Sequence, residues 1–191
     1  MAEAVERSTG IDLLVTAPDP LVPDTEALRF AADGIGVRTI DDDTWEDIFF
    51  RIFLERIEPE LGLDVPTVLH SYPASMAALA RISPEDPRIS ERFEIFVCGM
   101  ELANGYGELT DAAEQRARFS AMTQQRIALG RDPVPVDEDF LAALQSGIPD
   151  CAGVALGFDR LVMLATGAER IEDVLWAPVS DAGRYFTRQG G

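Results

Sequence analysis

Two short apolar segments separated only by Cys98 and Gly99 constrain the fold of this chain more than any other feature. Residues 93–97 and 100–103 both have strand-like composition, and a glycine between them suits the tight turn of a β-hairpin. Strands that pair locally, without long helical crossovers, form antiparallel sheets. We therefore predict an α+β fold in which an antiparallel β-sheet is flanked by helices. The other strands are predicted over residues 67–71 and 153–158.

Helices are predicted from capping residues and from the spacing of apolar residues. The run Asp41-Asp-Asp-Thr44 precedes apolar residues that recur every three or four positions, which predicts a helix packed on a core. These apolar residues are Trp45, Ile48, Phe49, Ile52, Phe53 and Ile57. Asp111 with Glu114 resembles a capping box at the start of a long helix that ends near residue 129. A further helix is predicted from Asp137 to Gly147.

Other segments are predicted to be irregular or interrupted. Residues 1–40 contain several prolines and are expected to hold only one short helix, over residues 26–32. Gly105 and Gly107 are expected to break the second strand of the hairpin, because glycine weakens a strand interior.

The charge balance limits the partners that this chain can have. The formal net charge is -18, and all 16 basic residues are arginine. A surface with this much negative charge repels the phosphate backbone of a nucleic acid. Strong nucleic-acid binding is therefore not expected. The arginines on acidic helical segments are interpreted as solvated: Arg51, Arg56, Arg116, Arg118 and Arg126. No apolar run has membrane-spanning length and residues 1–10 do not resemble a signal peptide, so we expect a cytoplasmic protein without membrane contact.

Few residues suit nucleophilic or zinc chemistry. His70 is the only histidine, which makes a Ser-His-Asp triad or a histidine-based zinc site improbable. Cys98 and Cys151 are far apart and show neither a metal-ligand spacing nor a disulfide framework.

Residues 153–160 read as an apolar strand, a glycine and the first turn of a helix. A helix N-terminus presents unpaired backbone N–H groups and a positive dipole end, which suits a phosphate group. Gly157 allows a flat ligand to approach the backbone. Arg160, next to Asp159, can form two hydrogen bonds to phosphate oxygens or stack on a base.

Two glutamates flank the predicted hairpin turn. A two-residue loop places Phe96 opposite Glu101 and puts Glu94 on the same face as Glu101, where two carboxylates can share a magnesium ion. A three-residue loop would separate them onto opposite faces. On pattern alone, two exposed strand glutamates are the more probable interpretation.

Asn104 and Glu108 are polar residues placed between glycines, where backbone can approach a ligand closely. A carboxylate at the end of a pocket suits an ammonium group. The competing interpretation is a polar turn at Asn104-Gly105, which the pattern alone favours.

Taken together, residues 93–111 and 153–163 resemble the catalytic core of the lysine-specific class II aminoacyl-tRNA synthetases, with the second block similar to motif 3. The nearest likeness is the elongation factor P–(R)-β-lysine ligase family, and it covers about residues 10–179. Thr110, Ala155 and the closing segment 171–178 resemble the ligases more than the synthetases. The resemblance implies one domain, with a helical lead-in at 1–64, a synthetase-like core at 65–179 and a flexible tail at 180–191.

The resemblance also implies roles for individual residues. Magnesium and ATP would be bound by Glu94, Glu101, Gly157, Asp159 and Arg160, of which Glu101 and Arg160 would be catalytic. Lysine or β-lysine would be held by Asn104, Glu108, Gly153 and Ala155, with Glu108 facing the side-chain ammonium. The implied reaction forms an aminoacyl-adenylate and passes it to an acceptor, which in this family is elongation factor P.

One departure from the family keeps alternatives open. Motifs 1 and 2 would precede residue 10. No Arg-x-Glu segment is expected in the strand-loop-strand that motif 2 requires, and Arg92-Phe-Glu94 belongs to the hairpin. The chain is thus expected to correspond to a C-terminal part of such an enzyme, to adenylate weakly or not at all by itself, and to self-associate. A tRNA-charging enzyme and a non-catalytic binding module remain the alternatives.

Overall fold

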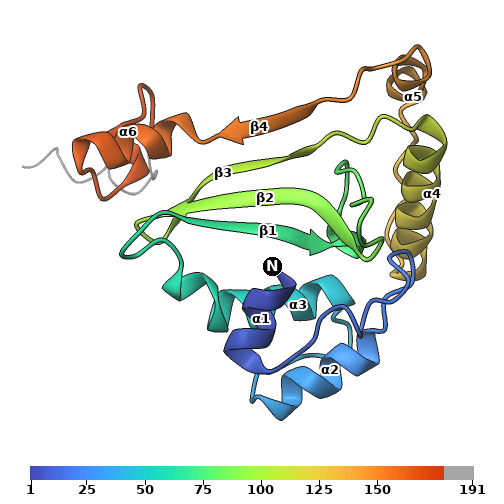
Figure 1. Cartoon of the computed structure of the whole chain (residues 1–191), viewed down its shortest axis with the longest axis horizontal. Coiled ribbons are helices and arrows are strands. Elements are labelled where there is room, and N and C mark those ends of the chain that lie inside the picture. The colour runs from blue at the N-terminus through green and yellow to red at the C-terminus, as the bar shows by residue number, and fades with distance from the viewer. Residues whose placement is uncertain (179–191) are drawn as a thin grey trace, which may run out of the picture. The chain divides into compact units, whose positions relative to one another are not determined.

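The computed structural model describes residues 1–178, and the chain divides into two compact units, Met1–Ala155 and Leu156–Gly191. The sheet has strand order β1-β2-β3-β4 (Figure 1), and all of its residues except Leu156, the last of β4, belong to the first unit. These strands are β1 (Thr67–Pro73), β2 (Ile89–Val97), β3 (Met100–Gly107) and β4 (Ala152–Leu156). Because β1, β2 and β3 pair antiparallel and helices pack on one side of the sheet (Figure 1), the predicted α+β fold is confirmed.

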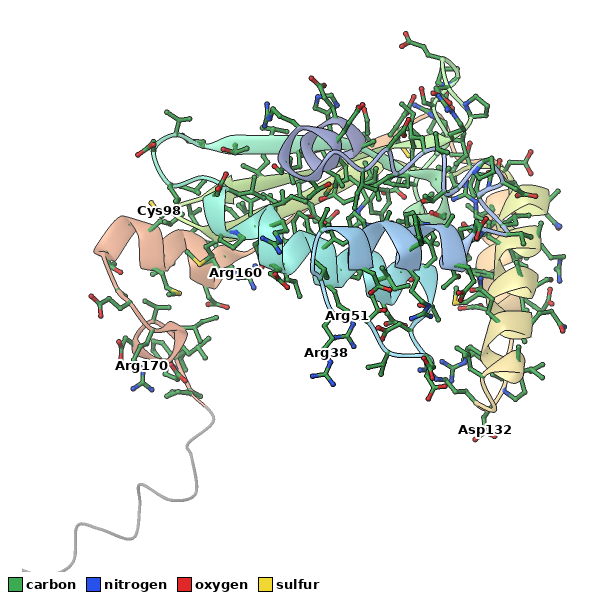
Figure 2. All side chains as sticks on the ribbon, turned by 90° about the horizontal axis from the view of Figure 1, so that it is seen from below. Arg38, Arg51, Cys98, Asp132, Arg160 and Arg170 are labelled. Atoms are coloured by element: carbon green, nitrogen blue, oxygen red, sulfur yellow. The ribbon has the colours of Figure 1, made fainter. Side chains whose placement is uncertain are left out.

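The register of the hairpin also agrees with the prediction. Phe96 lies opposite Glu101, and the two turn residues Cys98 and Gly99 have positive φ angles of 53° and 73°. Positive φ at both central positions is the backbone geometry that matches the twist of the two strands. Figure 2 shows Cys98 at the tip of the hairpin.

The glycines of β3 do not break the strand, so that prediction is wrong. Strand β3 continues to Gly107, and at Gly105 the missing side chain makes room for its neighbours. A Cβ atom added to Gly105 would lie 2.7 Å from the carbonyl oxygen of Gly153 and 2.7 Å from the ring of Phe93. Glycine here permits close contact with β4 instead of ending the strand.

Three helices lie together on one side of the sheet (Figure 1): α1 (Ala2–Thr9), α2 (Thr25–Gly34) and α3 (Trp45–Arg56). The apolar residues predicted to pack from α3 are all buried, and the ring of Phe53 lies against that of Phe96 in β2, tilted by 56° with ring centres 6.3 Å apart. Thr44 and Asp47 form a capping box at the start of α3. The helices and the sheet therefore share one apolar core.

The N-terminal 40 residues are more regular than predicted. Helix α1 was not expected, yet its residues include good helix formers and Val5, which is fully buried. The helix ends at Gly10, which has a φ of 77°. The short helix predicted over 26–32 is confirmed as α2, whose cap is the side chain of Asp24.

Helices α4 (Ala112–Ala128) and α5 (Glu138–Gln145) follow the sheet and match the predicted pair. Asp111 caps α4, but Glu114 pairs with Arg118 instead of completing a capping box. Arg118 is not a solvated arginine, which corrects that interpretation. Its guanidinium donates to the carbonyl oxygens of Ala78 and Ala80, at 3.0 and 2.8 Å.

The described part of the second unit, residues 156–178, contains α6 (Phe158–Thr166) and the short 3-10 helix η3 (Ile171–Asp173). None of these residues is buried. The predicted tail at 180–191 lies outside the described residues. Across residues 1–178, no helix combines the length and apolarity needed to cross a membrane.

Candidate functional site

A bulge in the hairpin decides which side chains share a face. Glu94 lies opposite Asn104 while Phe96 lies opposite Glu101, so β3 accommodates one extra residue, Leu102, between these pairs. Opposite residues share a face, and a shift of one residue moves later side chains to the other face. The bulge therefore brings Asn104 onto the face that already holds Glu94 and Glu101. An unbulged hairpin, as predicted, would place Ala103 opposite Glu94.

Glu94 is a buried carboxylate with two donors on one oxygen. The residue is only 8% exposed, and its Oε1 accepts from Arg92 Nη2 at 2.7 Å and from Asn104 Nδ2 at 3.1 Å. Burial of a carboxylate is tolerated when it is paired in this way. The interpretation of Glu94 as an exposed strand residue is therefore wrong.

Arg92 connects the carboxylate to two further groups. It donates to the carbonyl oxygen of Met76 at 3.2 Å, and its guanidinium carbon lies 4.6 Å from the ring centre of Tyr72. Burial raises the pKa of the Tyr72 phenol, and the charges of Glu94 and Glu101 raise it further. Although Glu94 is close enough to affect this pKa, the Tyr72 hydroxyl makes no hydrogen bond of acceptable geometry to the described residues.

Asn104 offers an unused acceptor at the same place. Its Nδ2 donates to Glu94, but its Oδ1 is buried and accepts no hydrogen bond from any described residue. A buried acceptor without a donor is unfavourable in the unliganded protein and suits an N–H group of a ligand. Asn104 is therefore equipped to bind an ammonium or amide group.

Glu108 and Gly153 come together between the end of β3 and the start of β4. The Glu108 backbone N–H donates to the carbonyl oxygen of Cys151 at 3.0 Å. A Cβ atom added to Gly153 would lie 2.8 Å from Oε1 of Glu108, so glycine leaves space for this carboxylate. Ala155 is two residues further along β4, on the same face as Gly153, and is exposed.

The phosphate-binding residues predicted from the helix start lie in the second unit. Gly157 is the N-cap of α6 and makes no side-chain cap, which leaves the first backbone N–H groups without an intrahelical partner. Asp159 and Arg160 are in the first turn, and both are exposed. The predicted site residues thus divide between the two units: six belong to residues 1–155 and three to the short unit that follows.

The donor set of the first unit fits magnesium only as a partial site. Across residues 1–178 no cluster of three or more His, Cys, Asp or Glu residues could hold a metal ion. Magnesium, however, is commonly held by one or two carboxylates together with substrate phosphates. Glu94 and Glu101 on one face satisfy that lesser requirement, and both donors to Glu94 use Oε1.

Sequence reasoning missed Arg92 and Tyr72 as members of this cluster. Arg92 is two residues before Glu94, and this spacing places both side chains on one face of a strand. A basic residue at that spacing was a usable signal. Tyr72 carried no comparable signal, because its position depends on the pairing of β1 with β2 opposite Ser90.

Comparisons with known proteins identify relatives of this chain. Residues 50–181 match the family described as tRNA synthetases class II (D, K and N). The chain is 50% identical over 163 residues to an elongation factor P–(R)-β-lysine ligase of Proteus mirabilis, covering 84% of this chain and 50% of that protein. It is 49% identical over 160 residues to the ligase of that name from Klebsiella pneumoniae, covering 82% and 49% respectively.

The match to a third relative covers a similar share of both chains. The elongation factor P–(R)-β-lysine ligase of Salmonella arizonae is 50% identical over 160 residues, covering 82% of this chain and 49% of that protein. The chain therefore spans about half the length of the curated relatives that it matches.

Proposed function

This chain belongs to the class II tRNA synthetase family of the D, K and N type, and from that premise we propose that it binds ATP and lysine or β-lysine for aminoacyl-adenylate formation. The relatives named elongation factor P–(R)-β-lysine ligase make elongation factor P the proposed acceptor. The observation that carries the proposal is the polar face of the hairpin. There the buried pair of Glu94 and Asn104 leaves the Asn104 acceptor without a partner.

The residues divide between two substrates in this proposal. Glu94 and Glu101 bind magnesium and ATP, and the backbone at Gly157 with Asp159 and Arg160 binds the nucleotide and its phosphates. The amino acid is held by Asn104, Glu108, Gly153 and Ala155. The space that Gly153 leaves beside the Glu108 carboxylate supports the assignment of Glu108 to the side-chain ammonium.

The proposed reaction needs no covalent protein nucleophile. A carboxylate oxygen of the amino acid attacks the α-phosphorus of ATP, the bond to the β-phosphate oxygen breaks, and pyrophosphate leaves. An acceptor amine then attacks the adenylate carbonyl and loses a proton, and AMP leaves. Bound magnesium would neutralise phosphate charge. The protein contributes mainly position and electrostatic stabilisation, with Arg160 and Glu101 as the catalytic residues.

A tRNA acceptor is the competing function. The net charge of -18 disfavours a phosphate backbone as partner and favours a protein acceptor. Whether lysine or (R)-β-lysine fits beside Ala155 is decided by comparing both amino acids in one assay. Self-association remains a prediction and is measured by light scattering during gel filtration.

Calorimetric binding by the purified chain is the direct test of the site. We expect Mg-ATP to bind, and one of the two amino acids to bind in its presence. Glu108→Gln is expected to weaken amino-acid binding about tenfold or more, because the partner of the ammonium group loses its charge. Glu85→Gln changes an exposed glutamate in the loop before β2 and is the matched control.

Two further measurements separate the alternatives. Amino-acid-dependent ATP–pyrophosphate exchange that is lost in Glu108→Gln would support adenylation, and the rate is expected to be low for this chain alone. Transfer of labelled amino acid is then compared between elongation factor P and tRNA. Equal amino-acid affinity in Glu108→Gln and Glu85→Gln, or no binding of either amino acid, would overturn the proposal.

A further inference from the structure

A cavity lies in the first unit, beside helix α4, and it adjoins the hairpin cluster through Arg92, which lines it and pairs with Glu94. Glu101, Asn104 and Glu108 do not line it. Its volume is about 590 Å³, which is within the range of small-molecule sites. One wall is the face of α4 that carries Gln115, Phe119 and Met122, at the spacing of successive helical turns. The short 3-10 helix η2 (Ala74–Met76) and Glu46, in the first turn of α3, also line the cavity.

Two of the lining residues carry polar atoms that the fold leaves unpaired. Gln115 is only 1% exposed, and its Oε1 accepts no hydrogen bond from any residue in the described part of the chain. The buried hydroxyl of Ser75 also has no partner among those residues. Buried polar atoms without partners are rare in folded proteins and are unfavourable. Both atoms are suited to a ligand that brings its own hydrogen-bond donor.

The charged residues around the cavity indicate the sign of the charge that such a ligand would carry. Both arginines that line the cavity form ion pairs, Arg92 with Glu94 and Arg118 with Glu114. The remaining charged lining residues are Asp19 and Glu46, and neither forms an ion pair with a residue that the structure describes. Three carboxylates therefore line the cavity (Asp19, Glu46 and Glu114) against two arginines, and Arg92, which attracts Glu46, also pairs with Glu94 outside the lining. This excess of negative charge favours a cation.

We propose that this cavity binds a primary amine carried on an apolar body. The ammonium group is bound by Glu46 and by the side-chain oxygens of Gln115 and Ser75. The apolar part packs against Phe119, Met122 and the rest of the apolar wall. The cavity borders the proposed adenylation site at Arg92, but Glu46, Gln115 and Ser75 are not among the residues assigned to ATP or the amino acid, and the proposal does not depend on that function.

The test uses two probes of the same shape on the full chain. The first is 4-phenylbutylamine and the second is 4-phenylbutan-1-ol, which has the same apolar body without the cation. We expect the amine to bind at least about tenfold more tightly, because a hydrogen bond to a charged group exceeds a neutral one by that order. Glu46→Gln is expected to remove most of this difference, whereas Glu55→Gln, on the same helix but outside the cavity, leaves it intact.

Gln115→Leu provides an independent readout. We expect it to weaken amine binding about tenfold while raising the denaturation midpoint, because it removes a buried oxygen that has no protein partner. Gln124→Leu, an exposed glutamine of α4 outside the cavity, is the matched control and should change neither quantity. A purely structural Gln115 would instead lower the midpoint. Met122→Trp, at a half-exposed position, should block the cavity without affecting the fold.

Three results would overturn this proposal. The first is equal affinity for the amine and the alcohol, or no saturable binding of the amine. The second is an equal effect of Gln115→Leu and Gln124→Leu on amine binding. The third is loss of amine binding in Glu108→Gln with retention in Gln115→Leu, because the amine would then occupy the proposed amino-acid site.

Discussion

The hairpin face of the first unit and the start of helix α6 in the second unit carry the two parts of the predicted site, and they are held in different ways. On the hairpin, Glu94 is buried and bound by Arg92 and Asn104. At α6, Asp159 and Arg160 are exposed and follow a cap that has no side-chain hydrogen bond.

The difference separates two ways in which a sequence can position a site. The hairpin side chains are fixed by one another, so removing one member leaves a buried charge or acceptor unpaired. Asp159 and Arg160 lie in the first turn of α6, and no described residue of that unit is buried. Matched substitutions in the two units should therefore have unequal effects on stability.

The largest contrast is expected for an arginine in each unit. Arg92→Met leaves the carboxylate of Glu94 buried without its cation and removes the contact with the Tyr72 ring, so we expect the free energy of unfolding to fall by about 3 kcal/mol. Arg170→Met removes the exposed pair with Glu172 and should change it by less than about 0.5 kcal/mol. Urea denaturation measures both, and equal effects would contradict the proposed difference between the units.

A glycine in each unit gives the next largest contrast. In Gly105→Ala the new methyl group meets the Gly153 carbonyl and the Phe93 ring, each at 2.7 Å, so the strands must separate and we expect a loss of about 2–3 kcal/mol. Gly167 caps α6 with a φ of 70° and has no atom near an added Cβ, so alanine there should cost about 1 kcal/mol from backbone strain alone. Thermal denaturation compares them, and a larger effect at Gly167 would reverse the interpretation.

The Gly105 position also shows where sequence reasoning stopped. A strand glycine can mark a break or a close approach, and only the neighbouring chain decides which. The pairing of Phe96 with Glu101 followed from a short turn signal and was predicted correctly. The bulge at Leu102 was not predictable, because an inserted residue has no marked residue type here and depends on the partner strand.

The same limit applies to the candidate site. The residues Glu94, Glu101, Asn104 and Glu108 were all chosen from the sequence, but the contact between Glu94 and Asn104 depends on the bulge. Arg118 was misjudged because its acceptors, the carbonyls of Ala78 and Ala80, come from a loop about 40 residues earlier. Local pattern identifies residue types, whereas long-range pairing decides their partners.

A threonine in each unit tests the contribution of capping. Thr44 accepts from the backbone N–H of Asp47 and completes a capping box, so Thr44→Ala should lower the free energy of unfolding by about 1 kcal/mol. The Thr166 hydroxyl donates to the carbonyl oxygen of Val162 within α6. Thr166→Ala should change the free energy of unfolding by less than about 0.5 kcal/mol, because alanine is the better helix former. Destabilisation of equal size at Thr166 would show that α6 relies on its side chains more than its exposure indicates.

The smallest effect, at pH 8, is expected at Tyr72. Its hydroxyl has no hydrogen-bond partner among the described residues, so Tyr72→Phe should change the free energy of unfolding at pH 8 by less than about 0.5 kcal/mol. Burial raises the pKa of this phenol, so the folded state retains a proton that the unfolded state loses as the pH rises past the ordinary tyrosine value. Stability is thus complete below that value and falls above it.

The phenylalanine variant should lose less stability than the native chain between pH 8 and about 10.5, since it has one fewer phenol to ionise on unfolding. Denaturation curves at both values, with tyrosinate absorbance recorded in the folded baseline, measure this difference. A loss above about 1 kcal/mol in Tyr72→Phe at pH 8 would mean that the hydroxyl donates to Glu94 after all. The carboxylate would then have three donors, and its remaining capacity to bind magnesium would be smaller than the hairpin geometry indicates.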